Sequence, residues 1–297
     1  MPHAHVIDGK ATAEKLRATI GEVVKRLKKD HSLIPGLAVV MVGEDPASRI
    51  YTRNKVKQTL AAGMHSIQRD FPADISQEEL AKEICSLNKD HSIHGILVQL
   101  PLPQHINPNG ILDLILPEKD VDGFHPVNVG RLGSGISSLV PCTPQGCLLL
   151  LKEVRSDLTG LHAVIVGRSN IVGKPLAQLL LAENCSITIV HSNTPEPHKL
   201  CLQADILISA AGRPEMIRKN WIKPGSIVID VGINRITTND GIKRIVGDVA
   251  FEDAAQVASA ITPVPGGVGP MTIACLLRNC VKTACEQQGL SLPHDIA

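Results

Sequence analysis

Aromatic side chains are scarce in this chain of 297 residues, which contains three phenylalanines, one tyrosine and one tryptophan. Proteins that bind single-stranded nucleic acids stack the bases on several aromatic rings, and this sequence cannot supply such a surface. An excess of charge is also absent, because 30 basic residues stand against 29 acidic ones and the net charge is +1. With no long-range field, we expect neither a nucleic-acid partner nor a membrane partner.

Long apolar runs are missing as well. The longest, around 95–100, has the length of a strand, whereas a membrane-spanning helix needs about 18 apolar residues or more. The first ten residues, MPHAHVIDGK, lack the basic start and apolar run of a secretory signal. The eight cysteines contain no Cys-x-x-Cys pair and the twelve histidines no His-x-x-x-His pair. We therefore expect a cytoplasmic protein with reduced cysteines and no metal site.

What remains is the composition of an ordinary globular protein, with 43% hydrophobic and 20% charged residues. The length is about twice that of a typical domain of about 150 residues, which favours two domains. Strand-like and helix-like stretches alternate along most of the chain, and this alternation predicts a parallel α/β architecture. Glycine, proline and short polar pieces interrupt the pattern over 120–144, and we place the domain boundary near Val140.

The expected elements can be set out on either side of that boundary. Before it we expect helices over 13–28, from about residue 46, and over 76–87, with strands over 37–42 and 96–100. After it we expect strands over 163–166, 187–190, 206–209 and 227–231, a helix from Gly173 and a long apolar helix over about 271–287. That final helix could return to the first domain.

The segment VIVGRSNIVGKP at 164–175 joins a buried strand to a helix through a glycine-bearing loop. Such a loop directs free backbone N–H groups at a phosphate. It is not a regular Gly-x-Gly-x-x-Gly fingerprint, because Ser169 occupies the second glycine position. The alternative is a simple tight turn, since glycine also permits close packing of helix on strand.

The next strand end, VHSNT at 190–194, contains no carboxylate to bind the ribose hydroxyls of NAD. Arg168 directly follows the first glycine of the loop. A cation and a hydroxyl without an acid suit a 2′-phosphate better than a bare diol, so the sequence favours NADP over NAD. A solvated surface arginine is the alternative interpretation.

In PASRIYTRNKVKQ, at 46–58, helical spacing places Ser48, Tyr51 and Lys55 on one face. A tyrosine can stack on a flat ring, and a lysine in a partly dry cleft can carry a proton. A basic, solvated helix is the alternative. Elsewhere, Gln99 interrupts an apolar strand and needs hydrogen-bond partners, and Asp122 lies in a glycine-containing turn where it could bind only backbone donors.

The segment ITPVPGGVGPMT at 261–272 combines three prolines and three glycines directly before a helix. This composition predicts a rigid loop whose N–H groups can approach a ligand, with Thr272 as a hydroxyl contact. The alternative is a plain helix entry, which needs far fewer glycines.

Seven motifs occur in order over nearly the whole chain: PAS-x-x-Y-x-x-x-K, GILVQLPLP, KDVDGFHP, PCTP, GRS-x-IVG-x-P, DVGIN and TPVPGGVGPMT. Each motif is weak to moderate alone, but the ordered set is specific. The set resembles the FolD family of bifunctional methylenetetrahydrofolate dehydrogenase/methenyltetrahydrofolate cyclohydrolases. The resemblance implies oxidation of methylene-tetrahydrofolate with NADP, followed by hydrolysis of the methenyl product to formyl-tetrahydrofolate.

The resemblance also implies a fold of two α/β domains with a cleft between them. Residues 1–140 with 275–297 would form a folate-binding catalytic domain, and 141–274 a Rossmann-type NADP-binding domain with a doubly wound parallel sheet. A homodimer formed through the cofactor domain is expected, again from the resemblance.

The resemblance implies four catalytic residues. Lys55 would move protons in the hydrolytic step and Gln99 would hold it in place. Tyr51 would stack on the folate, and Asp122 would bind the amino edge of the pterin. The substrate contacts would further include Ser48, Pro265 and Gly266. The NADP contacts would be Gly167, Arg168, Ser169, Ser192, Ile233, Thr143 and Thr272.

Two other functions remain open at this stage. A dehydrogenase of the same architecture could act on a small acid or sugar, but it would not require the stacking tyrosine or the rigid glycine–proline loop. A regulatory protein could bind a dinucleotide without chemistry, but it would not require Lys55.

Overall fold

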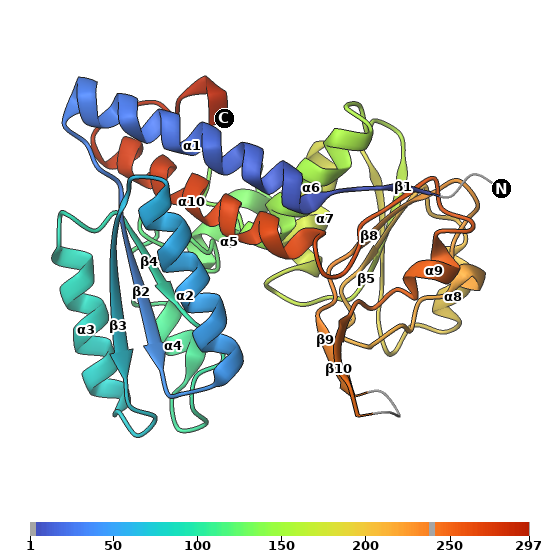
Figure 1. Cartoon of the computed structure of the whole chain (residues 1–297), viewed down its shortest axis with the longest axis horizontal. Coiled ribbons are helices and arrows are strands. Elements are labelled where there is room, and N and C mark those ends of the chain that lie inside the picture. The colour runs from blue at the N-terminus through green and yellow to red at the C-terminus, as the bar shows by residue number, and fades with distance from the viewer. Residues whose placement is uncertain (1–3, 238–240, 297) are drawn as a thin grey trace. The chain divides into compact units, whose positions relative to one another are not determined.

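A computed structural model describes residues 4–237 and 241–296, and the chain forms two compact units. One unit contains the residues up to Ala13 together with Thr143–Thr272, and the other contains Glu14–Cys142 together with the residues from Ile273 onwards. We call them the nucleotide unit and the folate unit, after the ligands that the resemblance implies for them. The divisions after Ala13 and Thr272 fall inside two long helices, α1 (Gly9–His31) and α10 (Val268–Gln287), which are labelled in Figure 1.

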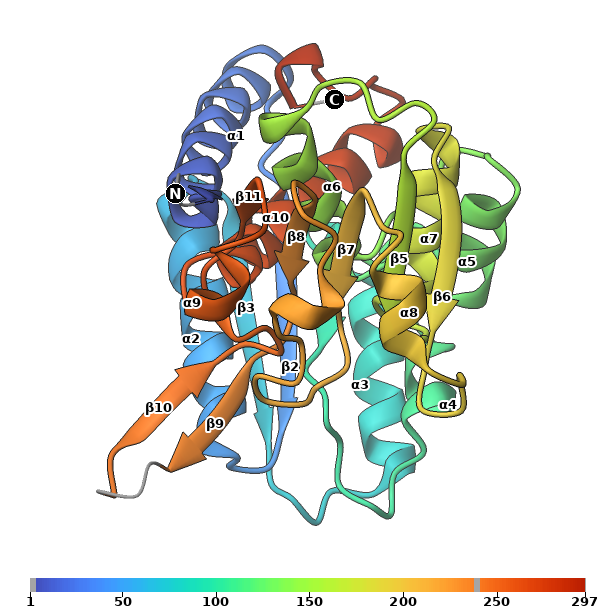
Figure 2. The ribbon, with the colours of Figure 1, turned by 90° about the vertical axis from the view of Figure 1, so that its right-hand side faces the viewer.

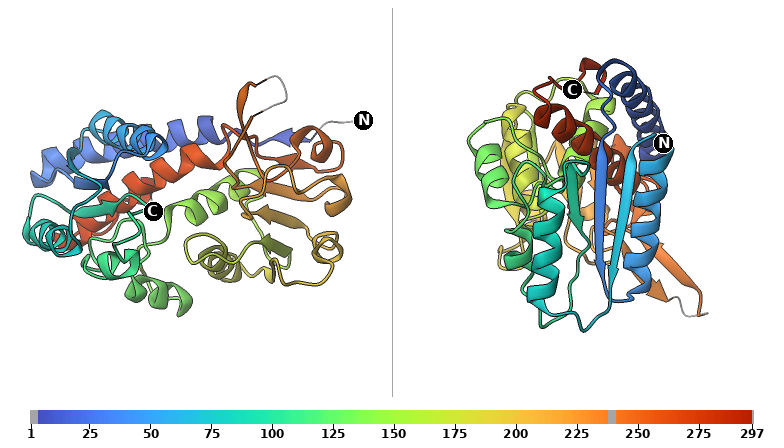
Figure 3. Two further views of the ribbon diagram at one scale, coloured as in Figure 1. Left: turned by 90° about the horizontal axis from the view of Figure 1, so that it is seen from below. Right: turned by 90° about the vertical axis from the view of Figure 1, so that its left-hand side faces the viewer.

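The folate unit is built on a parallel three-stranded sheet in the order β3-β2-β4. The strands are β2 (Gly36–Val42), β3 (His65–Phe71) and β4 (Gly95–Val98). Every residue of β2 is buried, because this central strand is covered on both faces. Figure 1 and the right-hand view of Figure 3 show α2 (Pro46–Ala61) and α3 (Gln77–Lys89) on opposite faces of the sheet.

Helix α3 begins where the sequence signals it. The predicted capping box is present at α3, where Ser76 and Glu79 satisfy each other's backbone N–H groups. Residues at alternate positions of β2, such as Ala38 and Val40, pack with Ile84 of α3 in one buried cluster. The remaining elements are α4 (Pro108–Leu112), α5 (Pro126–Gly133) and a short 3-10 turn, η2 (His294–Ile296).

The nucleotide unit is built on a parallel six-stranded sheet in the order β1-β11-β8-β7-β5-β6. Figure 2 shows β8, β7, β5 and β6 side by side. The strands are β1 (His5–Val6), β5 (His162–Val166), β6 (Ser186–Val190), β7 (Ile206–Ser209), β8 (Ile227–Asp230) and β11 (Ala260–Ile261). The chain leaves β5 to one side and returns to the other, so the strand order reverses at β5. Ligands bind open α/β sheets at such a reversal, outside the carboxyl ends of the strands.

The other elements of the nucleotide unit connect or extend this sheet. They are α6 (Cys142–Val154), which begins at the boundary, α7 (Gly173–Ala182), α8 (Pro197–Cys201), η1 (Lys219–Trp221), α9 (Phe251–Ala254) and an antiparallel hairpin of β9 (Asn234–Thr237) and β10 (Lys243–Val246).

At the start of the chain the compact units differ from the expected domains. The first thirteen residues were assigned to the catalytic domain, but the structure places the described part of this segment in the nucleotide unit. The reason is strand pairing, because His5 and Val6 lie beside Ala260 and Ile261 at the edge of the six-stranded sheet. The other two breaks, after Cys142 and Thr272, lie within a few residues of the expected ones.

Candidate active site

Helix α2 presents three predicted site residues at one-turn intervals. Asp45 caps the helix by accepting a hydrogen bond from the Ser48 backbone N–H at 2.7 Å. Ser48 is buried, Lys55 is half-buried, and Tyr51 between them is 38% exposed. Because residues three and four apart share a helix face, the tyrosine ring and the lysine amine are neighbours on the helix surface.

The amine of Lys55 has a fixed partner. Its Nζ donates to Oε1 of Gln99 at 3.0 Å, and the Gln99 Nε2 donates to the carbonyl of Leu100 at 2.7 Å. The Gln99 backbone N–H donates to the Val40 carbonyl at 2.9 Å, directly beyond the end of β4. Both ends of the Gln99 amide are therefore used, and its oxygen is oriented toward Lys55.

Asp122 lies in the turn that the sequence indicated, and the turn depends on the next residue. Gly123 has a φ of +70°, and a Cβ there would lie 2.7 Å from both Pro141 N and Val140 C, so a side chain is excluded. Burial raises the pKa of Asp122 to about 6, against the opposing effect of the nearby positive charge of Lys55. Lys55, Gln99 and Asp122 thus form one group in the folate unit.

Two residues beside this group, Cys142 and Asn279, were not predicted. The Cys142 thiol donates to the Val121 carbonyl at 3.3 Å and lies 3.9 Å from Oδ1 of Asp122. Burial raises the pKa of Cys142 well above its usual value, so the thiol stays neutral beside the carboxyl group. Asn279 of α10 donates to the carbonyls of Val121 and Val140, both at 2.8 Å. The sequence features that could have indicated these two residues are weak: a cysteine in the motif PCTP and an asparagine inside an apolar helix.

The glycine loop of the nucleotide unit packs as closely as its composition suggested. Gly167 has a φ of +126°, and a Cβ there would lie 2.3 Å from the Ala210 carbonyl oxygen. A Cβ at Gly173 would lie 2.3 Å from the Gly167 carbonyl oxygen. The Ser169 hydroxyl accepts from the N–H groups of Val172 and Gly173, at 3.1 and 3.4 Å, where α7 begins. The hydroxyl proton of Ser169 is therefore left to donate elsewhere.

Arg168 and Ser192 lie at the carboxyl ends of neighbouring strands, β5 and β6. The Gly167 N–H donates to the Val190 carbonyl at 2.9 Å, which joins the two strand ends. Both side chains are exposed, and the guanidinium of Arg168 has no ion pair within the part of the chain that the structure describes. An unpaired cation and a hydroxyl at the reversal of strand order can bind a phosphate.

The remaining predicted contacts lie in three other places in the nucleotide unit. Ile233, after β8, is 48% exposed. The hydroxyls of Thr143 and Thr272 are 3.0 Å apart. In the glycine–proline loop Pro265 is exposed, while the Gly266 carbonyl accepts from the Lys10 N–H at 2.9 Å and so fixes the loop against the start of α1.

Two further observations concern residues 4–237 and 241–296. No three acidic, histidine or cysteine side chains among them are placed to share a metal ion. None of their helices combines the length and apolar character that a membrane crossing requires.

Three features are typical of a dinucleotide-binding α/β protein: the reversal of strand order, the glycine turn at Gly167 and the unpaired Arg168. The second domain carries the amine of Lys55 near the carboxyl group of Asp122. Family models agree with this class. Residues 7–122 match the tetrahydrofolate dehydrogenase/cyclohydrolase catalytic domain, and residues 141–288 match the NAD(P)-binding domain of the same family. The chain belongs to the tetrahydrofolate dehydrogenase/cyclohydrolase family.

Relatives match the chain along its whole length. The bifunctional protein FolD of Rhodospirillum centenum is 59% identical, with 100% of this chain and 99% of that protein covered. The FolD of Parvibaculum lavamentivorans is 55% identical, with 98% and 99% covered. The predictions of the FolD family and of two α/β domains are confirmed.

Solved structures agree with the fold. The crystal structure of FolD from Campylobacter jejuni has a TM-score of 0.92 at 46% identity, with 96% of this chain and 99% of that chain covered. The dehydrogenase-cyclohydrolase of Trypanosoma brucei, complexed with NADP cofactor and an inhibitor, has a TM-score of 0.92 at 39% identity, with 97% and 99% covered. The matched NAD(P)-binding range, 141–288, includes the whole of α10, whereas the structure assigns the residues from Ile273 onwards to the folate unit.

Proposed function

We propose that this chain is a bifunctional, NADP-dependent enzyme of one-carbon metabolism. In the first step a hydride leaves the methylene carbon of methylene-tetrahydrofolate for the nicotinamide ring of NADP⁺, and methenyl-tetrahydrofolate remains. In the second step water adds to the methenyl carbon, one carbon–nitrogen bond breaks, and formyl-tetrahydrofolate forms. Family membership and full-length relatives support both steps.

The first step needs little acid–base chemistry, because the two nitrogens that flank the reacting carbon stabilise the cation as the hydride leaves. Its rate depends on holding two flat rings in contact. NADP supplies the hydride acceptor. The contribution of the protein is to bind and orient, and we assign stacking on the folate to Tyr51, whose ring is exposed on α2.

The second step needs a proton carrier, because water loses a proton and a ring nitrogen gains one. The observation that carries our assignment is the 3.0 Å hydrogen bond from Lys55 Nζ to Gln99 Oε1. This bond fixes the amine in one direction while leaving its other N–H positions for water or substrate. We assign proton transfer to Lys55 and its orientation to Gln99.

Asp122 binds the pterin in this proposal. An ionised carboxylate offers two acceptor oxygens to the adjacent N–H donors of the pterin amino edge. The position of Asp122 beside Lys55, with the neutral thiol of Cys142 on one side, supports this role. Ser48, buried one turn before Tyr51, lines the same face.

We assign binding of the NADP phosphates to the loop at 167–169 and to Ser192, because both follow the carboxyl ends of neighbouring strands. Arg168 reads the 2′-phosphate and thereby favours NADP. Ile233, Thr143 and Thr272 contact the cofactor elsewhere, and Pro265 and Gly266 border the substrate.

Two broader proposals accompany this function. The protein forms a homodimer through its nucleotide unit. This proposal is based on the resemblance to the family. It works in the cytoplasm, in keeping with the eight free cysteines.

One assay tests the function directly. The protein is incubated with methylene-tetrahydrofolate and NADP⁺, and the absorbance of NADPH and that of the methenyl compound are followed together. We expect NADPH to form and supplied methenyl-tetrahydrofolate to be hydrolysed. Formation of NADPH without accelerated hydrolysis would contradict the bifunctional assignment, and the absence of both would contradict the enzyme assignment.

A further inference from the structure

Asp248 follows β10 and is completely buried in the nucleotide unit. Its Oδ2 accepts from the backbone N–H groups of Ala211 and Gly212, at 2.7 and 3.0 Å, and from the Ser209 hydroxyl at 3.3 Å. Its Oδ1 accepts from the Arg213 N–H and from Nδ2 of Asn234, both at 2.9 Å. One carboxyl group therefore accepts from five donors, four of them at 209–213 and one at Asn234.

A second buried carboxyl group lies directly beside it. Asp230, at the end of β8, accepts from the backbone N–H groups of Gly232, Asp248 and Val249 at 2.9 to 3.0 Å. Burial raises the pKa of Asp230 to about 7, so this carboxyl group can hold a proton near neutral pH. No lysine, arginine or histidine pairs with either carboxyl group among the described residues.

The sequence leaves room for this pair at two glycines. A Cβ at Gly232 would lie 2.3 Å from Oδ1 of Asp248, and a Cβ at Gly247 would lie 1.8 Å from Oδ2 of Asp230. These glycines are required by close approach to the two carboxyl groups. The packing around the pair is thus as tight as that around the glycine turn at Gly167.

The loops that Asp248 holds follow β7 and β8 at the carboxyl end of the sheet. The first, at 210–213, touches the turn after β5, because Gly167 lies against the Ala210 carbonyl. The second, at 231–234, carries Ile233. We propose that Asp248 is a positioning residue for the dinucleotide, which fixes these two loops and, through Ala210, the glycine turn.

This inference rests on the proposed function, since it takes NADP as the ligand of that edge. A carboxylate suits the task because it has only acceptors to offer to five donors. An asparagine of the same shape would replace one oxygen with an NH₂ group that faces two or more N–H donors. The resulting loss should loosen the loops without removing any atom that contacts the cofactor.

The test is Asp248→Asn in the full-length protein, measured in both half-reactions. The KM for NADP should rise about tenfold or more, the equivalent of one lost hydrogen bond to a charged group. The kcat at saturating NADP should change much less. Hydrolysis of supplied methenyl-tetrahydrofolate needs no dinucleotide and should stay near the wild-type rate.

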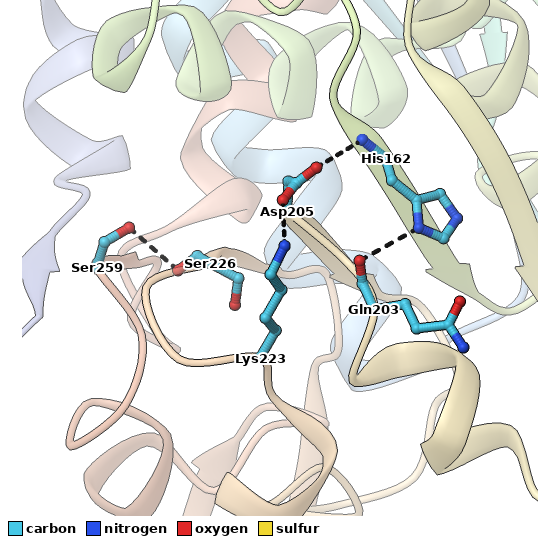
Figure 4. A network of polar contacts seen from close by, with 6 residues as sticks. All are labelled: His162, Gln203, Asp205, Lys223, Ser226 and Ser259. Carbon is cyan, nitrogen blue, oxygen red and sulfur yellow. Dashed lines mark hydrogen bonds and ion pairs between the residues drawn. The ribbon is translucent and has the colours of Figure 1, made fainter.

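A matched control lies in the same sheet, at the amino ends of its strands. Figure 4 shows Asp205, which accepts from the His162 N–H at 2.9 Å and from Nζ of Lys223 at 2.6 Å, at the amino ends of β5 and β7. Nearby, the Ser259 hydroxyl donates to the Ser226 carbonyl at 3.2 Å. Asp205→Asn also replaces a carboxylate whose hydrogen bonds link neighbouring segments of the sheet. It should nevertheless leave the KM for NADP unchanged.

A milder variant covers the case in which Asp248→Asn does not fold. Asn234→Ala removes one donor from Asp248 and should raise the KM for NADP in the same direction by a smaller factor. An unchanged KM in the folded variants, or an equal rise in Asp205→Asn, would overturn the proposal. Failure of the proposed function would be recognised separately, because the wild-type protein itself would then lack NADP-dependent turnover.

Discussion

Burial of Asp122 raises the pKa of its carboxyl group to about 6, which brings its ionisation into the range of an ordinary assay. Only the ionised form accepts hydrogen bonds from the pterin through both oxygens. Ionisation increases as the pH rises, so kcat/KM for the folate should rise as the pH passes about 6, since this ratio reports the free enzyme.

Asp122→Ala should abolish this dependence and weaken both activities through folate binding. We expect a rise in the folate KM of about tenfold to a hundredfold, because hydrogen bonds to charged groups contribute about 1.5–3 kcal/mol. The pH profiles of the wild-type protein and of Asp122→Ala give the measurement. An unchanged folate KM in the alanine variant would remove Asp122 from the pterin site.

Arg168 provides a second test at a single side chain. Arg168→Ala should lower the preference for NADP over NAD, measured as the ratio of the two kcat/KM values, by about tenfold to a hundredfold for the same energetic reason. Lys174→Ala is the control, because this exposed cation at the start of α7 donates to Oδ1 of Asn170 at 2.8 Å. If the ratio does not change in Arg168→Ala, another group recognises the phosphate.

The sequence could indicate Lys55, Tyr51 and Gln99 because each follows a local rule of spacing or of an interrupted apolar strand. It could not indicate Cys142 or Asn279, which reach the site only when segments 137 residues apart meet. The Asp230–Asp248 pair could not be predicted from the sequence for the same reason. Its two members come from the ends of β8 and β10, and their burial exists only in the folded sheet.

Among the elements, the turn at Gly123 packs directly against the backbone of Leu139 and Val140. Gly123→Ala should cost about 1–2 kcal/mol for the left-handed backbone and about 1–3 kcal/mol more for overpacking. Gly135→Ala is a matched control, because Gly135 has nearly the same φ of +69° but nothing within 4 Å of a built Cβ.

The measurement is the free energy of unfolding in urea for both variants. Gly123→Ala should lose more stability than Gly135→Ala, and it should also lose folate affinity because Asp122 moves with the turn. Equal losses of stability would show that close packing at Gly123 contributes nothing.

Most long elements could be predicted because their apolar residues follow the period of a helix or fill a buried strand. The polar edge strand β3 was missed, because its sequence HSIQRDF carries no buried run. The two-residue strands β1 and β11 and the hairpin of β9 and β10 were also missed. Such short strands are set by tertiary pairing, and β1 alone moved the start of the chain into the other unit.

At the scale of the whole molecule, binding of NADP should stabilise the folded chain. A ligand at a hundred times its dissociation constant adds about 2.7 kcal/mol to the free energy of unfolding. We expect the melting temperature to rise with NADP and to rise less with the same concentration of NAD. Equal shifts with the two dinucleotides would contradict recognition of the 2′-phosphate.

The proposed homodimer is tested by light scattering coupled to gel filtration. The expected mass is twice that of the 31.7 kDa chain. A mass of one chain at assay concentrations would exclude the dimer without affecting either half-reaction.

In the proposed mechanism Lys55, held by Gln99, moves the protons of the hydrolytic step and takes no part in hydride transfer. The most direct measurement is Lys55→Met with methylene-tetrahydrofolate and NADP⁺, following NADPH and the methenyl compound in the same cuvette. We predict that NADPH still forms while methenyl-tetrahydrofolate accumulates, because only its hydrolysis has lost the proton carrier. Hydrolysis at the wild-type rate in this variant would contradict the account.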